Sequence, residues 1–98
     1  PAKVSAPMTS VVVVEGLAAL LKCHIRGDRP IDVVWRKNSI VLEQSPRIVL
    51  QTVLDANSSV LSAELRFQHS ERSDSGLYVC TGSNHFGRDE DRISFEVK

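Results

Sequence analysis

Five separate segments of the chain alternate strictly between apolar and polar side chains, and this pattern constrains the fold more than any other feature. A period of two is typical of a β-strand that buries only one face. Five such strands need a second sheet to cover them, so we predict an all-β, two-sheet antiparallel sandwich. The apolar positions that carry the pattern are Ala19, Leu21, Cys23, Ile25, Ile31, Val33, Trp35, Leu61, Ala63, Leu65, Phe67, Tyr78, Cys80, Ile93, Phe95 and Val97.

Turn-forming residues separate these segments about every 8 to 12 residues, a spacing typical of sandwiches and barrels. Pro7 fits only at an edge or a kink, so we expect the first strand to be split into residues 4–6 and 10–14. Residues 84–87 read as a tight hairpin that ends in a glycine. The length suits one domain, and we assign residues 1–98 to it.

Charge and hydropathy exclude several classes of protein. Twelve basic and twelve acidic side chains cancel, whereas nucleic-acid binders and polybasic membrane-surface domains need a clear positive excess. No segment approaches the length of about 18 apolar residues that a membrane-spanning helix requires, and residues 11–14 are too short for a signal peptide. We therefore expect any membrane contact to be made by parts of a longer protein outside residues 1–98.

The residues also argue against a catalytic site, a metal site or a cofactor. Two cysteines alone cannot build a tetrahedral zinc site, and Cys23 and Cys80 are too far apart for a redox Cys-x-x-Cys motif. They form either a disulfide or two reduced core thiols. The three histidines are scattered without a nucleophile motif. The mixed charges of residues 88–92 fit a solvated hairpin better than a calcium site, which needs six to eight converging oxygens.

One combination of residues is specific for a known fold. Trp35 follows Cys23 by twelve residues and precedes Cys80 by 45, and residues 74–80 read Asp-Ser-Gly-Leu-Tyr-Val-Cys. The chain thereby resembles an immunoglobulin domain. The split first strand and the short segment 40–43 are similar to the I-set subtype. The resemblance implies a disulfide between Cys23 and Cys80 that joins the two sheets, with Trp35 beside it.

The same resemblance implies roles for other residues. The hydroxyl of Tyr78 is expected to bond the backbone near residues 73–74, and Asp74 to pair with Arg47, closing one end of the sandwich. Gly82 stands where the I-set usually has alanine, which predicts a small gap in the core. All of these residues are expected to build the fold.

Within the I-set, residues 27–37, 75–80 and 83–89 are similar to the Down syndrome cell adhesion molecule (Dscam) family, above all to its last immunoglobulin domain before the fibronectin type III repeats. This likeness implies the extracellular part of a single-pass neuronal receptor with homophilic adhesion, axon guidance and self-avoidance. The domain would be a spacer or a constant contact surface. Its partners would be the same or a related cell-surface protein and adjacent domains, with no small-molecule substrate. The alternative is a structural I-set domain of an intracellular muscle filament protein.

Three surface features suggest sites. Residues 57–59, Asn-Ser-Ser, form an N-glycosylation sequon in a predicted exposed loop, which makes Asn57 a candidate glycan acceptor. Residues 26–28 form the Arg-Gly-Asp tripeptide that some integrins read, although a turn between strands is the favoured interpretation. Val34, Leu77 and Val79 are predicted on the outer face of one sheet, where a contiguous apolar patch would be a contact surface.

Overall fold

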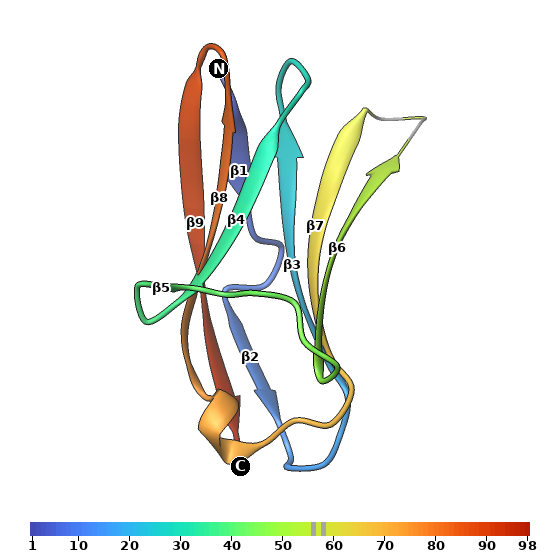
Figure 1. Ribbon diagram of the computed structural model, residues 1–98, viewed down its shortest axis with the longest axis vertical. Coiled ribbons are helices and arrows are strands. Elements are labelled where there is room, and N and C mark those ends of the chain that lie inside the picture. Colours follow the sequence, from blue (N-terminus) through green and yellow to red (C-terminus); the bar gives the residue numbers. More distant parts are fainter. Residues whose placement is uncertain (56, 58) are drawn as a thin grey trace.

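The computed structural model describes residues 1–55, 57 and 59–98 and consists of two β-sheets packed face to face (Figure 1). The four-stranded sheet has the order β1 (Lys3–Ser5), β3 (Ala19–Arg26), β7 (Val60–Phe67), β6 (Ile48–Asp55). The five-stranded sheet has the order β2 (Ser10–Val13), β9 (Gly87–Val97), β8 (Gly76–Asn84), β4 (Asp32–Lys37), β5 (Ile40–Val41). A single-turn 3-10 helix, η1 (Arg72–Asp74), precedes β8. The predicted all-β sandwich is confirmed.

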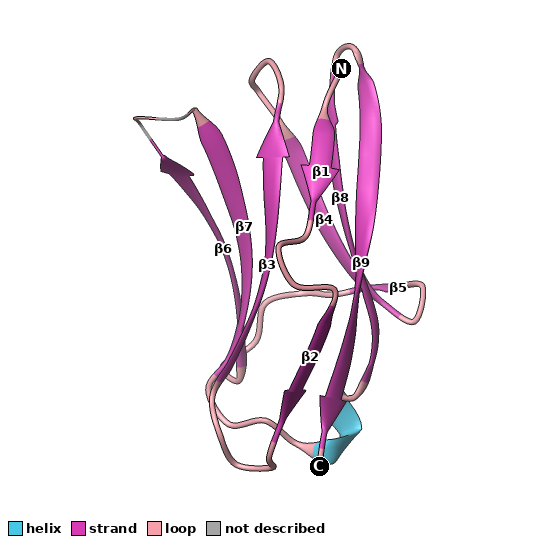
Figure 2. Cartoon of the chain, turned by 180° about the vertical axis from the view of Figure 1, so that it is seen from behind, coloured by secondary structure: helices cyan, strands magenta, loops and turns pink. Residues whose placement is uncertain are grey.

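The first strand is split at Pro7, as the sequence predicts, and its halves join different sheets (Figure 2). Strand β1 pairs antiparallel with β3, whereas β2 pairs with β9 in parallel. This pair makes the five-stranded sheet mixed, whereas the other strand pairs of the described residues are antiparallel, as predicted. Proline suits the crossing because it has no N–H to leave unpaired between the sheets.

The core lies between the sheets and contains the inward positions of the alternating segments. Leu21, Cys23, Ile25, Leu65 and Ile93 are fully buried. Each large apolar side chain removed from water contributes about 1.5–3 kcal/mol, so this shared face holds the two layers together. The rings of Phe67, Tyr78 and Phe95 pack on one another with centroids 4.9–5.9 Å apart.

The predicted gap at Gly82 was wrong. A Cβ built on Gly82 would lie 3.0 Å from Cγ2 of Ile25 and 3.2 Å from Cγ2 of Val4, so neighbouring side chains already fill the space. Ile25 is fully buried, and because protein interiors are closely packed, a shift of its side chain would be costly. In this chain the Ile25 side chain occupies the space that the methyl group of an alanine at position 82 would need.

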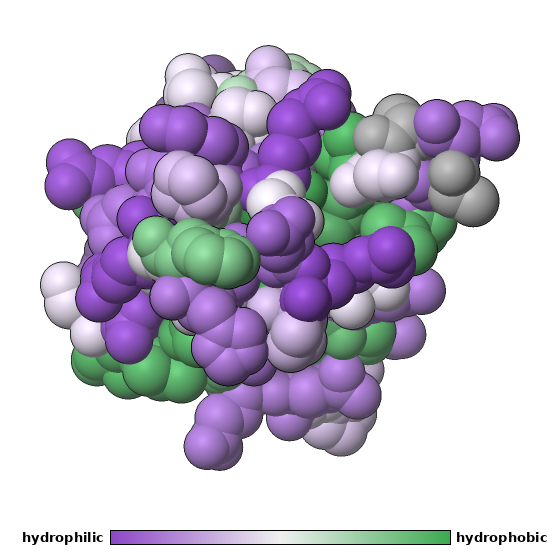
Figure 3. Space-filling view, turned by 90° about the horizontal axis from the view of Figure 1, so that it is seen from above, coloured by the Kyte–Doolittle hydropathy of each residue, from purple (hydrophilic) through white to green (hydrophobic). Residues whose placement is uncertain are grey.

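The two termini lie at opposite ends of the longest dimension, which measures 39 Å (Figure 1). The N-terminal end also carries the β8–β9 hairpin, in which Gly87 adopts φ +144° and Asn84 Oδ1 accepts a hydrogen bond from the Phe86 N–H. Seen from this end, the surface is mostly hydrophilic, with apolar areas separated from one another (Figure 3). The loops at this end of the sandwich are thus largely solvated.

Candidate interaction surface

The cysteine pair bridges the two sheets. Cys23 in β3 and Cys80 in β8 are joined in a disulfide, with their Cα atoms 6.6 Å apart. Trp35 in β4 pairs with Cys80 across the sheet and is buried beside the bridge. The bond closes a loop of 57 residues, which stabilises by roughly 4 kcal/mol if loop entropy dominates. These three residues pack the core and present no reactive group to solvent.

Asp74 organises the end of the sandwich at which the chain finishes. Its carboxylate accepts two hydrogen bonds from the Arg47 guanidinium, at 2.9 and 3.0 Å, and one from the Glu71 N–H at 2.7 Å. Its carbonyl accepts the Tyr78 hydroxyl at 2.5 Å. Burial raises the pKa of Asp74, but the hydrogen bonds from Arg47 and Glu71 outweigh it and lower the pKa below its usual value.

Tyr78 shares this environment and titrates well above the usual tyrosine range, because burial and the nearby Asp74 charge both raise its pKa. Its hydroxyl therefore stays protonated and acts as a hydrogen-bond donor, not as a base. The cluster of Arg47, Asp74 and Tyr78 directs its polar atoms at one another and at backbone. This arrangement closes the fold, as the sequence analysis expected of these residues.

The acidic residues of the last hairpin do more than the sequence analysis expected. Arg88, Glu90 and Arg92 are exposed, in keeping with a solvated hairpin, but Asp89 and Asp91 are half-buried. Asp89 Oδ2 accepts the Val4 N–H and Asp91 Oδ2 accepts the Ala6 N–H, both at 2.8 Å. The bond from Val4 is the main cause of a lowered pKa at Asp89. The solvated-hairpin interpretation was thus wrong for these two carboxylates, which hold β1 against β9.

Val34, Leu77 and Val79 lie on the outer face of the five-stranded sheet, opposite Trp35 and Tyr78. Leu77 is 43% exposed, whereas Val34 and Val79 are less exposed and partly buried. Across the sheet, Val79 pairs with Arg36 on β4 and with Arg92 on β9. Leu77 and Val79 therefore form the floor of a mixed surface with arginines on both sides, and Val34 lies beside it, opposite Thr81.

The remaining candidate motifs lie elsewhere. Asn57 is exposed in the β6–β7 turn of the four-stranded sheet, while Ala56 and Ser58, the middle residue of the sequon, lie outside the described residues. A Cβ on Gly27 would lie 3.1 Å from the Ala2 Cα, and the Asp28 carbonyl accepts a hydrogen bond from Asn84. The Arg-Gly-Asp turn is exposed, and it contacts two neighbouring segments, at Ala2 and at Asn84.

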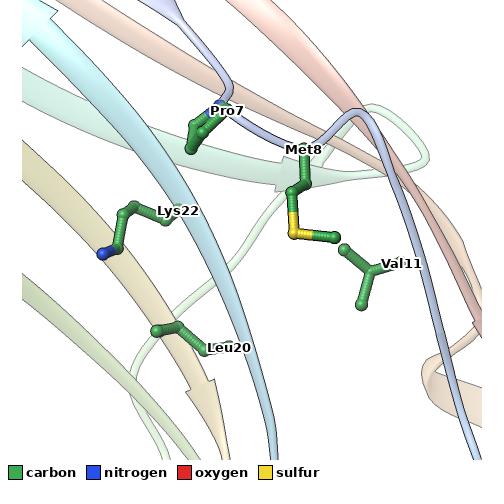
Figure 4. A pocket seen from close by; sticks show the side chains of 5 residues that line it. All are labelled: Pro7, Met8, Val11, Leu20 and Lys22. Atoms are coloured by element: carbon green, nitrogen blue, oxygen red, sulfur yellow. The ribbon is translucent and has the colours of Figure 1, made fainter.

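A small apolar pocket of about 210 Å³ lies where the chain changes sheets (Figure 4). Its lining side chains come from the β1–β2 link, from β2 and from β3: Pro7, Met8, Val11, Leu20 and Lys22. The sequence does not predict this pocket, because the pocket depends on where β1 leaves the edge of β3. Apart from the Lys22 side chain its lining is apolar, so the pocket offers little to orient a ligand.

Within the described residues, no group of three or more His, Cys, Asp and Glu side chains is arranged to hold a metal ion. None of the described helices has the length and apolar composition needed to cross a membrane. The described polar side chains gather in two kinds of place. Some form hydrogen-bonded pairs that stabilise the fold, and others flank the outer face of the five-stranded sheet.

Two sheets linked through a disulfide, with a tryptophan packed beside the bridge, define an immunoglobulin-type domain. The chain belongs to the immunoglobulin I-set domain family, whose model matches residues 2–97. The predicted subtype is therefore confirmed.

Individual relatives refine this assignment. The chain is 35% identical over 95 residues to the cell adhesion molecule Dscam2 of Drosophila melanogaster, covering 96% of this chain and 5% of that protein. It is 33% identical over 81 residues to the muscle M-line assembly protein unc-89 of Caenorhabditis elegans, covering 83% of this chain and 1% of that protein. The predicted likeness to Dscam is confirmed, and the chain spans only about a twentieth of that relative's length.

Solved structures agree on the fold. In a crystal structure of Dpr2 Ig1-Ig2 in complex with DIP-Theta Ig1-Ig3, one chain superimposes with a TM-score of 0.91 at 18% identity. The match covers all of this chain and 32% of that chain. At this identity the similarity supports the fold alone.

Proposed function

We propose that this chain is a recognition or spacer module in the extracellular part of a multi-domain, single-pass neuronal receptor, and that it performs no catalysis. The observation that carries the proposal is the likeness to Dscam2, a cell adhesion molecule, along 96% of the chain. Partners would be the same or a related cell-surface protein and the adjacent immunoglobulin and fibronectin domains. The parent protein would act in homophilic adhesion, axon guidance and self-avoidance.

Two features of the chain support an extracellular location. Disulfides persist in oxidising compartments and are rare in the cytosol, and Cys23 and Cys80 are joined in one. Asn57 is exposed at a hairpin turn, where a glycan could be attached without disturbing the core. A glycan there would extend from the four-stranded sheet and leave the outer face of the five-stranded sheet free for contacts.

The second candidate is a structural domain of an intracellular muscle filament protein. It is favoured by the 33% identity to unc-89, a muscle M-line assembly protein. In that setting Cys23 and Cys80 would be reduced thiols and Asn57 would stay unmodified, because the cytosol keeps thiols reduced.

Surface labelling of the parent protein in its own cells separates these candidates. We expect a membrane-impermeant biotin reagent to label it on intact cells. Alkylation of denatured, unreduced protein should leave Cys23 and Cys80 unmodified, and removal of N-glycans should change its mobility unless Asn57 is replaced by glutamine. Labelling only after permeabilisation, together with two alkylated thiols, would exclude the extracellular proposal.

A further inference from the structure

The outer face of the five-stranded sheet is hollowed over β8, between β4 and β9. The depression measures about 480 Å³ and is lined by Arg36, Ser39, Leu77, Val79, Thr81, Arg88, Glu90 and Arg92. Leu77 and Val79 form its apolar part, and arginines from both neighbouring strands flank it. It therefore combines an apolar floor with charged walls. This combination suits a ligand in which an apolar side chain stands next to a charged group.

The charges of the depression are unbalanced. Three arginines and one glutamate leave a surplus of two positive charges, on a chain whose total charge is zero. Glu90 is within 3.4 Å of Arg88 and 4.0 Å of Arg92, whereas Arg36 has no acidic partner among the described residues. The side chains of Arg88 and Arg92 are each 68% exposed, so their pairs with Glu90 are weak and easily exchanged for another carboxylate.

Thr81 adds a polar side chain to the depression. Its side chain lines the depression and the residue is only 7% exposed, yet its hydroxyl has no hydrogen-bond partner among the described residues. A buried hydroxyl without a partner is unfavourable, and native proteins rarely leave one. A carboxylate or carbonyl oxygen of a bound segment would supply the missing acceptor after a rotation of the Thr81 side chain.

We propose that this depression binds a segment of a partner protein in which carboxylates flank an apolar side chain. The apolar side chain would lie on Leu77 and Val79, and the carboxylates would pair with Arg36 and Arg92, since guanidinium groups bind carboxylates through two parallel hydrogen bonds. The inference deepens the proposed function, because it names the contact chemistry of a recognition module.

Two other occupants fit less well. A sulfated glycan would pair with the arginines, but it has no apolar group to cover Leu77 and Val79. A second copy that presents the same face would bring like charges together across a twofold axis, which opposes association. A partner surface that carries acidic and apolar side chains next to one another matches both the arginines and the apolar floor of the depression.

The test is a titration of this domain, followed by NMR, with a synthetic peptide of alternating glutamate and leucine. We expect saturable shifts of the Val79, Thr81 and Arg92 amides. Replacing Arg36→Glu and Arg92→Glu together should weaken the affinity by about tenfold or more, because partner carboxylates would then be repelled. Arg26→Glu with Arg29→Glu makes the same change in net charge outside the depression and should leave the affinity unchanged.

Thr81→Val distinguishes binding from folding. Valine keeps the shape of threonine, so we expect unchanged or higher stability but an affinity lowered by about two- to tenfold.

The variant Arg36→Gln with Arg92→Gln repeats the arginine test should the double reversal fail to fold.

Three results would overturn the proposal: no saturable shifts with the acidic peptide, equal binding of an alternating lysine–leucine peptide, or tighter binding of a heparin hexasaccharide. Each leaves the surface-labelling result for the parent protein untouched, so the two proposals fail separately.

Discussion

Asp74 shows how one residue of the motif near Cys80 stabilises the fold. Its side chain is 5% exposed, and its two carboxylate oxygens accept hydrogen bonds from the Arg47 guanidinium and the Glu71 N–H. A buried carboxylate is tolerated because both oxygens are paired. The residue therefore acts as a structural anion, and the Tyr78 hydroxyl is bonded to the backbone of the same residue.

Replacing Arg47→Ala should destabilise the domain by about 3 kcal/mol, because it leaves the Asp74 carboxylate buried without its main partner. We place the loss at the lower end for a buried pair because the Arg47 side chain is 36% exposed. Urea denaturation measures it. Arg72→Ala, which removes an exposed pair with Glu15 at 3.9 Å, serves as the control and should cost under about 1 kcal/mol. Equal losses in both variants would contradict the assigned role of Asp74.

Gly82→Ala should also destabilise, by about 1–3 kcal/mol, because the new methyl group would overlap the buried Ile25 side chain. Thermal unfolding of Gly82→Ala, Ile25→Val and the double variant forms a double-mutant cycle. Ile25→Val removes the Cδ1 atom that lies 3.2 Å from the added Cβ, so the double variant should lose less than the sum of the single losses. Additive losses would show that the Cδ1 atom of Ile25 does not restrict the space beside Gly82.

The roles of some of these residues could be predicted from the sequence, and the roles of others could not. The fold residues Cys23, Trp35 and Tyr78 could be assigned because a motif fixes their relative positions. The space beside Gly82 could not, because it depends on which rotamer Ile25 adopts on the facing sheet. Similarly, alternation placed Val79 on the outer face but did not reveal that Arg36 and Arg92 would flank it, since strand register decides which side chains are neighbours.

At the scale of elements, β1 is held from two sides. One edge pairs with β3 over three residues, while the Val4 and Ala6 N–H groups are bound by Asp89 and Asp91 of β9. These side chains connect the two sheets at an edge where no backbone ladder does. This role was not predictable from the sequence, because the local pattern places the acids on a hairpin but does not place the N-terminal strand beside them.

Asp89→Ala combined with Asp91→Ala should therefore loosen β1 selectively. Hydrogen exchange at the Val4 and Ala6 amides should accelerate by about tenfold or more, since each loses a bond to a charged acceptor. The Ile25 amide, inside β3, provides the internal control and should keep its protection. Loss of protection throughout the core would instead indicate global destabilisation, and unchanged exchange at Val4 would contradict the contact.

At the scale of the molecule, two lowered carboxyl pKa values predict how stability depends on pH. Asp74 and Asp89 release their protons more readily in the folded state than in the unfolded chain, where an aspartate titrates near pH 3.9. Their contribution is therefore complete above about pH 4 and is lost as the pH falls through the lower folded-state values.

Urea denaturation between about pH 7 and pH 2 should show a plateau followed by a decline below about pH 4. The decline should be shallower in Asp89→Asn, because one of the two groups no longer titrates. A free energy of unfolding that stays constant or rises on acidification would contradict both the Arg47–Asp74 and the Val4–Asp89 interactions.

The whole sandwich was predictable because alternation determines that each strand has one buried face. The parallel pairing of β2 with β9 was not, since the uninterrupted valines of residues 11–14 carry no alternation. The partner of β2 begins more than seventy residues later in the chain. Local patterns specify faces and turns, whereas the direction in which distant strands meet depends on the assembled topology.

The parallel pair has a mechanical consequence. Strands β2 and β9 run in the same direction, and the chain ends lie at opposite poles of the long axis. Tension applied through those ends would draw β2 and β9 past each other lengthwise, loading all the hydrogen bonds between them at once instead of opening them one by one. This arrangement opposes tension along the long axis of the domain more strongly than a geometry in which the bonds open one at a time.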